Sequence, residues 1–289
     1  MKKISALPEY DLILIDGMNL LVREFFAKQF LSYRGKPTGM QFGTLTALNY
    51  LQRLLASRGK IFFLWEGGVS VRKSKSISYK ANRTSLKHDG FVESISDIKN
   101  ILSRIDVVQC SHVGLEADDL AGYFCKHFSE KKILLVTTDR DWYQFMRKDR
   151  IDIMTRNVIR TYDEIESLLQ FPPEHIAIWK ALKGDVSDNI KGIPRLPEIS
   201  AIAFARSCST LEDLRRAVEN IRETKWGTRI LNNWTTIVEN DMLVRFHPEW
   251  ISRKQLVVVK GVLNKPLLKS YLQNRGMSSL VKHMHLERV

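Results

Sequence analysis

The stretch Gly114-Leu115-Glu116-Ala117-Asp118-Asp119-Leu120 places three carboxylates within four residues. Apolar residues follow it at intervals of three or four, which predicts a helix that begins here, at Leu120, Ala121, Phe124 and Phe128. Acidic residues commonly cap a helix start, because the free backbone N–H groups carry partial positive charge. Three in one turn exceed what a cap needs, and a site that keeps several carboxylates ionised usually holds a cation. Capping and cation binding both remain open at this point.

Short apolar runs elsewhere in the chain each lead into further carboxylates. The runs 11–16, 61–65, 106–109 and 133–137 read as buried strands, and they lead to Asp16, Glu66, the Glu116 turn, and the pair Asp139 and Asp141. Helical segments separate the first strands, at 20–30 and 41–55. Right-handed crossovers then give a parallel α/β sheet with all carboxyl ends on one edge. Each acid alone fits an ordinary turn, but together they are expected to converge.

A basic segment, 69–91, leaves the sheet from that same edge. It carries few acids, one tyrosine at Tyr79, and a series of cations: Arg72, Lys73, Lys75, Lys80, Arg83 and Lys87. A solvated loop is the commonest fate of such a run, but a basic, partly aromatic segment above an acidic site also fits a clamp on a phosphate backbone. The net charge of +13 favours a polyanionic partner, nucleic acid ahead of an anionic membrane surface.

The composition favours a globular protein of the cytoplasm. The chain has 289 residues, 44% of them hydrophobic, enough for one large domain or two closely packed ones. Its three cysteines form neither a zinc spacing nor a disulfide framework, which suits a reducing compartment. The first 14 residues do not resemble a signal peptide, and no apolar run is long enough to span a membrane.

The second half of the sequence is mainly helical. After a hairpin over 151–160, a helix over 174–182 leads to Lys183-Gly184-Asp185-Val186-Ser187-Asp188-Asn189. If this stretch is helical, Asp185 and Asp188 share one face. A short strand is expected near 256–260. We divide the chain into an α/β core, 1–165, and a helical C-terminal part, 166–289.

Five motifs in this order resemble the 5′-nuclease, or flap endonuclease, family. They are Ile15-Asp16-Gly17-Met18-Asn19-Leu20, Ser78-Tyr79-Lys80-Ala81-Asn82-Arg83, Gly114 to Asp119, Thr138-Asp139-Arg140-Asp141-Trp142, and Gly184 to Ile190. Each is weakly specific, but five in register across about two thirds of the chain are strongly so. The resemblance is greatest to the free-standing bacteriophage enzymes, and the sequence is also similar to the 5′-nuclease domain of bacterial DNA polymerase I.

The resemblance implies a PIN-like α/β fold with a helical arch over 69–91 and a helix–turn–helix DNA-binding element in the C-terminal part. It implies two Mg²⁺ ions, for which Mn²⁺ can substitute. One ion would be held by Asp16, Glu116, Asp118 and Asp139, and the second site would be completed by Asp119, Asp141, Asp185 and Asp188. Lys80 and Arg83 would contact the scissile phosphate. Further DNA contacts would come from Arg23, Arg72 and Tyr79.

The sequence departs from the family pattern at two places. Glu66 stands where the family usually has Asp, and it would act on the metal through water. The turn Gly192-Ile193-Pro194-Arg195-Leu196-Pro197-Glu198 lacks most of the glycines that allow DNA to approach backbone amides. Duplex contact there is expected to rely on the side chains of Lys191 and Arg195.

The function implied is a structure-specific 5′→3′ exonuclease and flap endonuclease that acts on DNA with 5′ single-stranded or flap ends. RNA–DNA hybrids are a second substrate class that stays open, as do a single-strand binding protein or a polymerase as partners. The cytoplasm, the host's if the source is a phage, is the expected location. Two alternatives remain: a PIN-type ribonuclease, and a DNA-binding module with an impaired active site.

Overall fold

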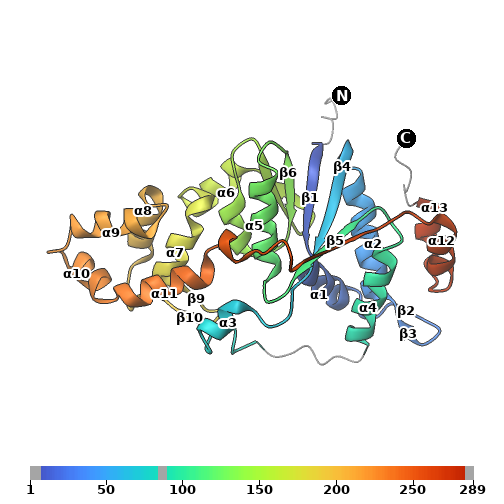
Figure 1. Cartoon of the computed structure of the whole chain (residues 1–289), viewed down its shortest axis with the longest axis horizontal. Helices are drawn as coiled ribbons and strands as arrows, with labels where there is room; N and C mark the ends of the chain where they lie inside the picture. The colour runs from blue at the N-terminus through green and yellow to red at the C-terminus, as the bar shows by residue number, and fades with distance from the viewer. Residues whose placement is uncertain (1–7, 84–89, 284–289) are drawn as a thin grey trace.

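A seven-stranded sheet forms the centre of the molecule in the computed structural model, which describes residues 8–83 and 90–283 (Figure 1). The strand order is β11-β5-β4-β1-β6-β7-β8. The strands are β1 (Tyr10–Asp16), β4 (Leu55–Leu64), β5 (Val108–His112), β6 (Ile133–Val136), β7 (Ile151–Thr155), β8 (Val158–Arg160) and β11 (Leu256–Lys260). The five inner strands are parallel and the two edge strands are antiparallel to their neighbours. The expected, mostly parallel α/β sheet is confirmed.

Alternate residues of the central strands feed two separate hydrophobic cores. Ile13 and Ile15 face a core built with α1 (Gly17–Ala27), α2 (Gly39–Gln52) and α4 (Phe91–Leu102). Leu12 and Leu14 face a second core built with α5 (Ala117–His127), the 3₁₀ turn η1 (Arg140–Phe145) and α6 (Tyr162–Leu169). Because helices cover both faces, the central strands need apolar side chains at nearly every position.

A helical part adjoins the second core and has a core of its own. It comprises η2 (Pro173–His175), α7 (Ile176–Lys183), α8 (Glu198–Ser207), α9 (Leu211–Glu219), α10 (Lys225–Asn232) and α11 (Trp234–Val244). Figure 1 shows these helices at the end of the molecule opposite the C-terminus. Between α7 and α8 lies the two-stranded hairpin of β9 (Gly184–Asp185) and β10 (Ile190–Lys191).

The chain then returns to the α/β body. After η3 (Pro248–Trp250), β11 pairs with β5, and α12 (Lys265–Gln273) and α13 (Ser278–His283) pack into the core that contains α2 and α4. The expected strand at 256–260 is therefore present. This return corrects the expectation of one helical part over 166–289, since residues 256–283 belong with the sheet.

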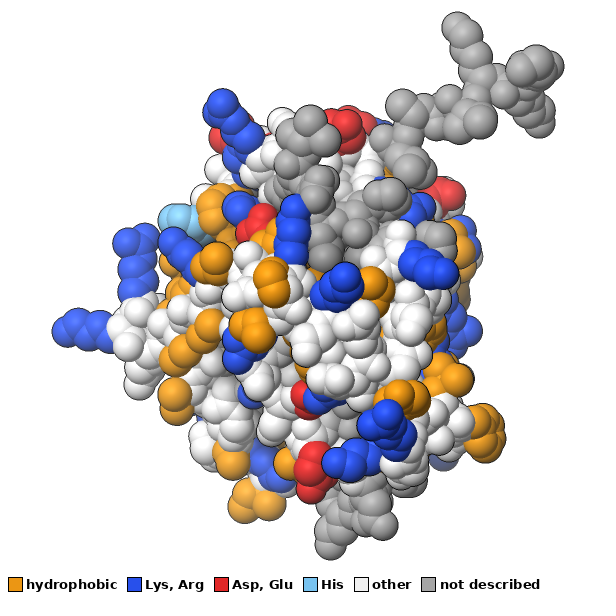
Figure 2. Space-filling model, turned by 90° about the vertical axis from the view of Figure 1, so that its right-hand side faces the viewer, with side chains coloured by type: hydrophobic (Ala, Val, Ile, Leu, Met, Phe, Trp, Pro, Cys, Tyr) orange, Lys and Arg blue, Asp and Glu red, His pale blue; other side chains and the backbone are white. Residues whose placement is uncertain are grey.

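The remaining short elements lie around the sheet's edge and surface. They are β2 (Ser32–Tyr33), β3 (Lys36–Pro37) and α3 (Val71–Lys75). Figure 2 shows Lys and Arg side chains scattered over the face at the α12 and α13 end, with few acidic ones among them. On this face the positive charge is therefore dispersed rather than gathered into one patch. None of the helices in the described ranges is long and apolar enough to cross a membrane.

Candidate active site

The carboxylates that follow the strands meet at one edge of the sheet. Asp16 ends β1, Glu66 follows β4, Asp139 follows β6, and Glu116 and Asp118 open α5. All five line one cavity of about 400 Å³ together with the cations Arg23, Lys80 and Arg83. The parallel register explains this, because Asp16 pairs with Leu64 and Ile15 pairs with Val136, so that the strands end side by side.

Hydrogen bonds from neighbouring backbone and side-chain groups hold Asp16 and Asp139 in place. The Asp16 carboxylate accepts from the backbone N–H of Asn19 at 3.1 Å and from the Thr137 hydroxyl at 2.9 Å. The Asp139 carboxylate accepts from the backbone N–H of Asp141 at 2.9 Å. The Asn19 side chain also bonds to Thr138, which links the ends of β1 and β6. The two carboxylates are therefore fixed before any ligand arrives.

The two acids at the start of α5 have different surroundings. Asp118 Oδ1 accepts from the indole N–H of the fully buried Trp142 at 2.7 Å. Glu116 accepts from the Tyr79 hydroxyl at 3.1 Å and from Lys80 Nζ at 2.7 Å. Glu116 is also the N-cap of α5 in a capping box with Asp119, so capping and site formation coexist in this turn.

The pKa values reflect these surroundings. Burial raises the pKa of Asp16 to about 7. Burial, with the nearby charge of Asp139, raises the pKa of Asp118 well above its usual range. Burial also raises the pKa of Glu116, but the charges of Lys80 and Arg72 outweigh it and the net pKa is lowered. Among the described residues, Glu116 forms a salt bridge with Lys80, whereas Asp16 and Asp118 form none.

Two overlapping groups of carboxylates have the spacing of metal sites. Oxygens of Asp118, Asp139 and Asp141 lie within 4.8 Å of one another, and so do oxygens of Asp141, Asp185 and Asp188. Asp141 belongs to both groups. Hard oxygen ligands of this kind suit Mg²⁺ or Mn²⁺.

The second group already contains a cation. Lys180, on α7, is 5% exposed, and its Nζ bonds to Asp185 at 2.6 Å and also to Asp141. Asp188 pairs with Arg83. The charge of Lys180 lowers the pKa of Asp185 to about 2 against the opposing effect of burial. The sequence-based prediction missed Lys180, whose signal is a lysine within the helical run Ile176 to Leu182, most of which is apolar and buried.

The expectation that Asp185 and Asp188 share a helical face is wrong, because their stretch forms the β9–β10 hairpin. Gly184 has φ of +78°, and a Cβ there would lie 2.3 Å from the backbone nitrogen of Gly192. A left-handed glycine against a neighbouring strand ends α7 and turns the chain. Asp185 and Asp188 converge through this turn instead.

Three residues that were expected to bind metal or DNA are instead buried, where they hold other residues of the site in place. Arg72 is 3% exposed and forms two hydrogen bonds with Asp119, at 2.7 and 2.8 Å, so its guanidinium does not face a phosphate. Asp119 is fully buried, accepts from Arg72 and from the backbone of Glu116, and lies in neither metal group. Tyr79 is 3% exposed and its hydroxyl bonds to Glu116, so it offers no ring for base stacking.

The basic segment is anchored to the β9–β10 hairpin. Lys80 has φ of +54°, and its backbone N–H donates to Asp188 O at 2.9 Å. The Asn189 side chain donates to Ser78 O at 2.8 Å. Part of the expected arch, residues 84–89, lies outside the described residues. The described part contains the single short helix α3, and α4 begins at its end, at Phe91.

The other three residues expected to bind DNA are partly or fully exposed. Arg23 lines the acidic cavity and pairs with Glu24 at 3.1 Å. Lys191 and Arg195 are exposed in the connection between α7 and α8. Arg195 has φ of +57°, in a turn that carries Pro194 and Pro197 on either side of it.

Comparison with known proteins decides the family. Residues 11–171 match the model of the 5′-3′ exonuclease N-terminal resolvase-like domain. The chain belongs to the 5′-3′ exonuclease family. It is therefore a nuclease with the resolvase-like, PIN-like fold. Its chemistry is expected at the acidic rim, the sheet edge where Asp16, Glu66, Glu116, Asp118 and Asp139 line one cavity.

Relatives with measured similarity support this assignment. A 5′-3′ exonuclease of Buchnera aphidicola is 29% identical over 217 residues, which cover 73% of this chain and 75% of that protein. One of Halalkalibacterium halodurans is 30% identical over 230 residues, covering 73% and 74%. The thermostable DNA polymerase I of Thermus filiformis is 25% identical over 218 residues, 74% of this chain but only 26% of the polymerase.

Solved structures share the fold of this family member. The bacteriophage T5 D15 protein co-crystallised with metal ions has a TM-score of 0.66 and 21% identity, covering 83% of this chain and 90% of that one. The catalytic core of Rad2 in complex with DNA substrate has a TM-score of 0.59 and 15% identity, covering 96% and 92%.

Proposed function

We propose that the protein is a divalent-metal-dependent 5′→3′ exonuclease and flap endonuclease, with two Mg²⁺ ions, that cleaves DNA near a free 5′ end. The observation that carries the proposal is the pair of overlapping carboxylate groups that share Asp141. Lys80 and Arg83 line the same rim, so cations for a phosphate stand beside oxygens for metals. Mn²⁺ is expected to substitute for Mg²⁺.

The donor set fits divalent cations. The first group, Asp118, Asp139 and Asp141, contains only oxygen donors, and burial raises the pKa of Asp118 and of Asp141, the latter to about 7. Such carboxylates lose protons readily only when a cation compensates them. Asp16, Glu66 and Glu116 would act on the same ion directly or through water. Asp185 and Asp188 would complete the second site with Asp141.

Bound metal ions would stabilise the charge on the oxygens of the reacting phosphate and lower the pKa of a water molecule. Cationic side chains of the protein would contact the same phosphate. Lys80 is 18% exposed in its side chain and Arg83 is 48% exposed, so both can reach a phosphate that enters the cavity. Both are held by carboxylates, Glu116 and Asp188, which orient them before substrate binds.

Duplex DNA would lie across the helical part. The connection between α7 and α8 presents Lys191 and Arg195 to solvent, and helices flank it on both sides. We propose this connection as the helix–turn–helix element that contacts phosphates, with the core at 1–165 as the catalytic part. The D15 protein and Rad2 structures include complexes with DNA, which supports DNA as the ligand here. RNA–DNA hybrids belong to the same proposal as a second substrate.

The cytoplasm is the proposed location, because Cys110, Cys125 and Cys208 are free and buried. The two alternative functions have weaker support. A DNA-binding module has no need for buried, mutually repelling carboxylates, and a smaller PIN-type ribonuclease has no counterpart of the Asp185 and Asp188 hairpin.

The test is cleavage of a DNA flap labelled at its 5′ end, with Mg²⁺ and with EDTA. We expect metal-dependent cleavage that falls about 100-fold or more in Asp139→Asn and in Lys80→Asn, because each change removes a charge next to the reacting phosphate. Asparagine suits position 80 since its φ of +54° lies in the left-handed region. Asp149→Asn is the matched control, an exposed acid with φ of +61° outside the site.

Three outcomes are informative. No cleavage by the folded wild-type protein with Mg²⁺ or Mn²⁺ would leave the DNA-binding module. Cleavage of single-stranded RNA but not of flaps would favour the ribonuclease. Equal loss in Asp149→Asn and Asp139→Asn would show that the effect does not come from the rim.

A further inference from the structure

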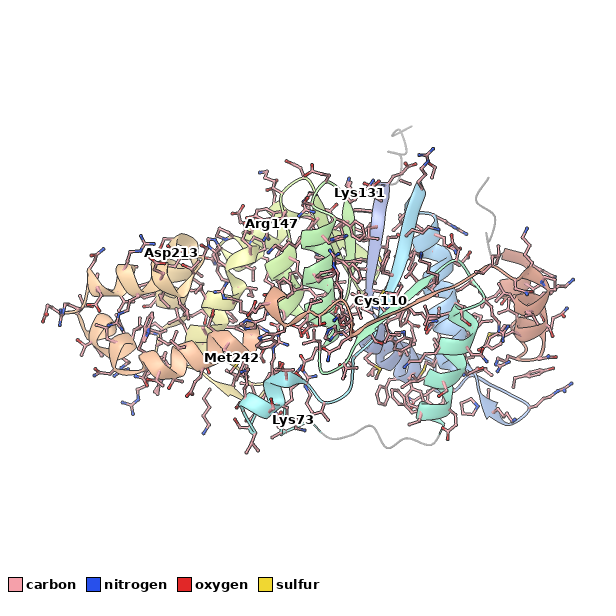
Figure 3. The ribbon with its side chains drawn as sticks, in the orientation of Figure 1. Lys73, Cys110, Lys131, Arg147, Asp213 and Met242 are labelled. Atoms are coloured by element: carbon pink, nitrogen blue, oxygen red, sulfur yellow. The ribbon has the colours of Figure 1, made fainter. Side chains whose placement is uncertain are left out.

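A second concave site lies away from the acidic rim. Its walls come from the second half of α5, from η1 with the turn that follows it, and from the end of α11, and its volume is about 500 Å³. Along α5, Cys125 in this pocket stands about 10 Å from Asp118 at the rim, at 1.5 Å of rise per residue. Figure 3 shows Arg147, which lines the pocket, on the opposite side of the molecule from Lys73 in α3.

The floor of this pocket is apolar. The rings of Phe145 and Phe246 meet edge to face with centroids 5.7 Å apart. Both pack on Gly122, where a Cβ would lie 2.7 Å from either ring. The absence of a side chain at Gly122 therefore lets two aromatic rings come from different elements to form one surface.

The outer edge of this pocket is cationic. Arg147 donates to the carbonyl oxygens of Gln144 at 3.0 Å and Met146 at 2.6 Å. Arg150 makes only long contacts, 3.5 Å, with two carbonyl oxygens of α5 and its end. Within the described ranges neither guanidinium, nor Lys126, forms an ion pair with a carboxylate. Burial and the adjacent charge of Arg147 lower the pKa of Arg150.

Few carboxylates balance these three charges. Arg245, which also lines this pocket, is already paired with Asp241 at 2.7 Å. Glu174 lines the pocket and accepts from the Tyr162 hydroxyl at 2.7 Å. Glu130 and Glu249 lie near Arg150 and Lys126 and offset part of their charge, but neither acid lines the pocket. The lining therefore carries a positive excess above an apolar floor.

We propose that this pocket binds a short acidic segment of a partner protein, with an apolar side chain on the Phe145 and Phe246 floor and its carboxylates against Lys126, Arg147 and Arg150. Cations placed above an apolar floor favour a peptide that carries both carboxylates and an apolar side chain. A duplex is too wide to enter a hollow of this size. A single strand could engage the cations, but Phe145 is 5% exposed and meets Phe246 edge to face, so this floor offers no pair of open ring faces for stacked bases, whereas an apolar side chain can pack against it.

The test uses a fluorescein-labelled peptide, Asp-Asp-Glu-Asp-Leu-Phe, and anisotropy at low and moderate salt. We expect saturable binding that weakens about tenfold in the double variant Lys126→Ala/Arg147→Ala, and about tenfold when Gly-Ser replaces Leu-Phe in the peptide. Lys131→Ala, an exposed cation outside the pocket, is the matched control and should bind like wild type. Phe246→Ser is a second, floor variant.

Cleavage of the flap substrate separates this proposal from the nuclease assignment, because the pocket variants should cleave at the wild-type rate. The proposal is overturned if the peptide shows no saturable binding, or if Lys131→Ala weakens it as much as the pocket variant does. It is also overturned if dAMP or inorganic phosphate binds there and the peptide does not, or if the double variant stops cleavage while remaining folded.

Discussion

Arg72→Met tests whether the buried pair with Asp119 holds the site together. Arg72 is 3% exposed and Asp119 is fully buried. Besides two hydrogen bonds to Asp119, the guanidinium donates to Leu243 O at 2.8 Å and Arg245 O at 3.0 Å, so it joins α3, α5 and the end of α11. Removing it leaves a buried carboxylate without a cation and two carbonyl oxygens with fewer donors.

The expected cost is about 3–5 kcal/mol in the free energy of unfolding, the range for removing one partner of a buried ion pair. Most of this cost is the unpaired charge, so Arg72→Met/Asp119→Leu should recover at least about 1 kcal/mol relative to Arg72→Met. Urea unfolding followed by tryptophan fluorescence measures the wild-type protein, Arg72→Met, Asp119→Leu and the double variant. Lys60→Met is the control, because its pair with Asp106 is half exposed at 50% and 41%, and it should change stability by less than about 1 kcal/mol.

A loss below about 1 kcal/mol for Arg72→Met, or a double variant whose loss equals the sum of the two single losses, would refute this reasoning. In that case the guanidinium would be exchangeable for water. Arg72 would then again be available as a phosphate contact.

Further predictions concern metal and pH. Mg²⁺ should raise the free energy of unfolding by about 2.7 kcal/mol at 100 times its dissociation constant, because it binds only the folded protein, and EDTA should reverse the rise in a thermal unfolding experiment. In EDTA, the free energy of unfolding should fall as pH rises from about 4 to about 7, since the folded pKa values of Asp16 and Asp141 lie near 7 and the unfolded chain releases those protons earlier. Asp16→Asn should make this fall smaller, with Asp141 contributing the remainder. The pKa of Asp213 is shifted in the opposite direction, because hydrogen bonds from Thr210 and Ser209 lower it to about 2. Its contribution to the free energy of unfolding is therefore full above about pH 4 and is lost towards pH 2. Asp213→Asn should flatten the acid side of the pH profile measured by thermal unfolding.

The sheet and the convergence of the acids were predictable because both follow from local patterns and one topological rule. Apolar runs mark the strands, and parallel pairing then sends every strand end to one edge. Boundaries were less predictable. The helix expected to reach Leu55 ends at Gln52, and β4 begins at Leu55 rather than near Ile61, because this strand extends back to pair with Tyr10.

The supporting residues of the site were not predictable from charge alone. A sequence shows that Arg72, Asp119 and Tyr79 are polar but not that they face inward, because burial depends on which element later packs over them. Arg72 is covered by residues 243–250, over 170 positions away, through Leu243 O and the ring of Trp250. No periodic pattern near position 72 contains that information.

The charge balance along the rim predicts which carboxylates respond most to metal. Asp185 pairs with Lys180 and Asp188 pairs with Arg83, whereas Asp118 is half-buried beside Asp139 and has no ion pair with a cation among the described residues. A divalent ion therefore relieves more repulsion at the first group, where Lys180 pairs with Asp141 alone, than at the second, where Lys180 pairs with both Asp141 and Asp185. Asp118→Asn should accordingly remove more of the Mg²⁺-induced gain in unfolding free energy than Asp188→Asn does. An equal or larger loss in Asp188→Asn, measured by thermal unfolding at matched Mg²⁺, would mean that the ion displaces the lysine and that the hairpin site is the tighter one.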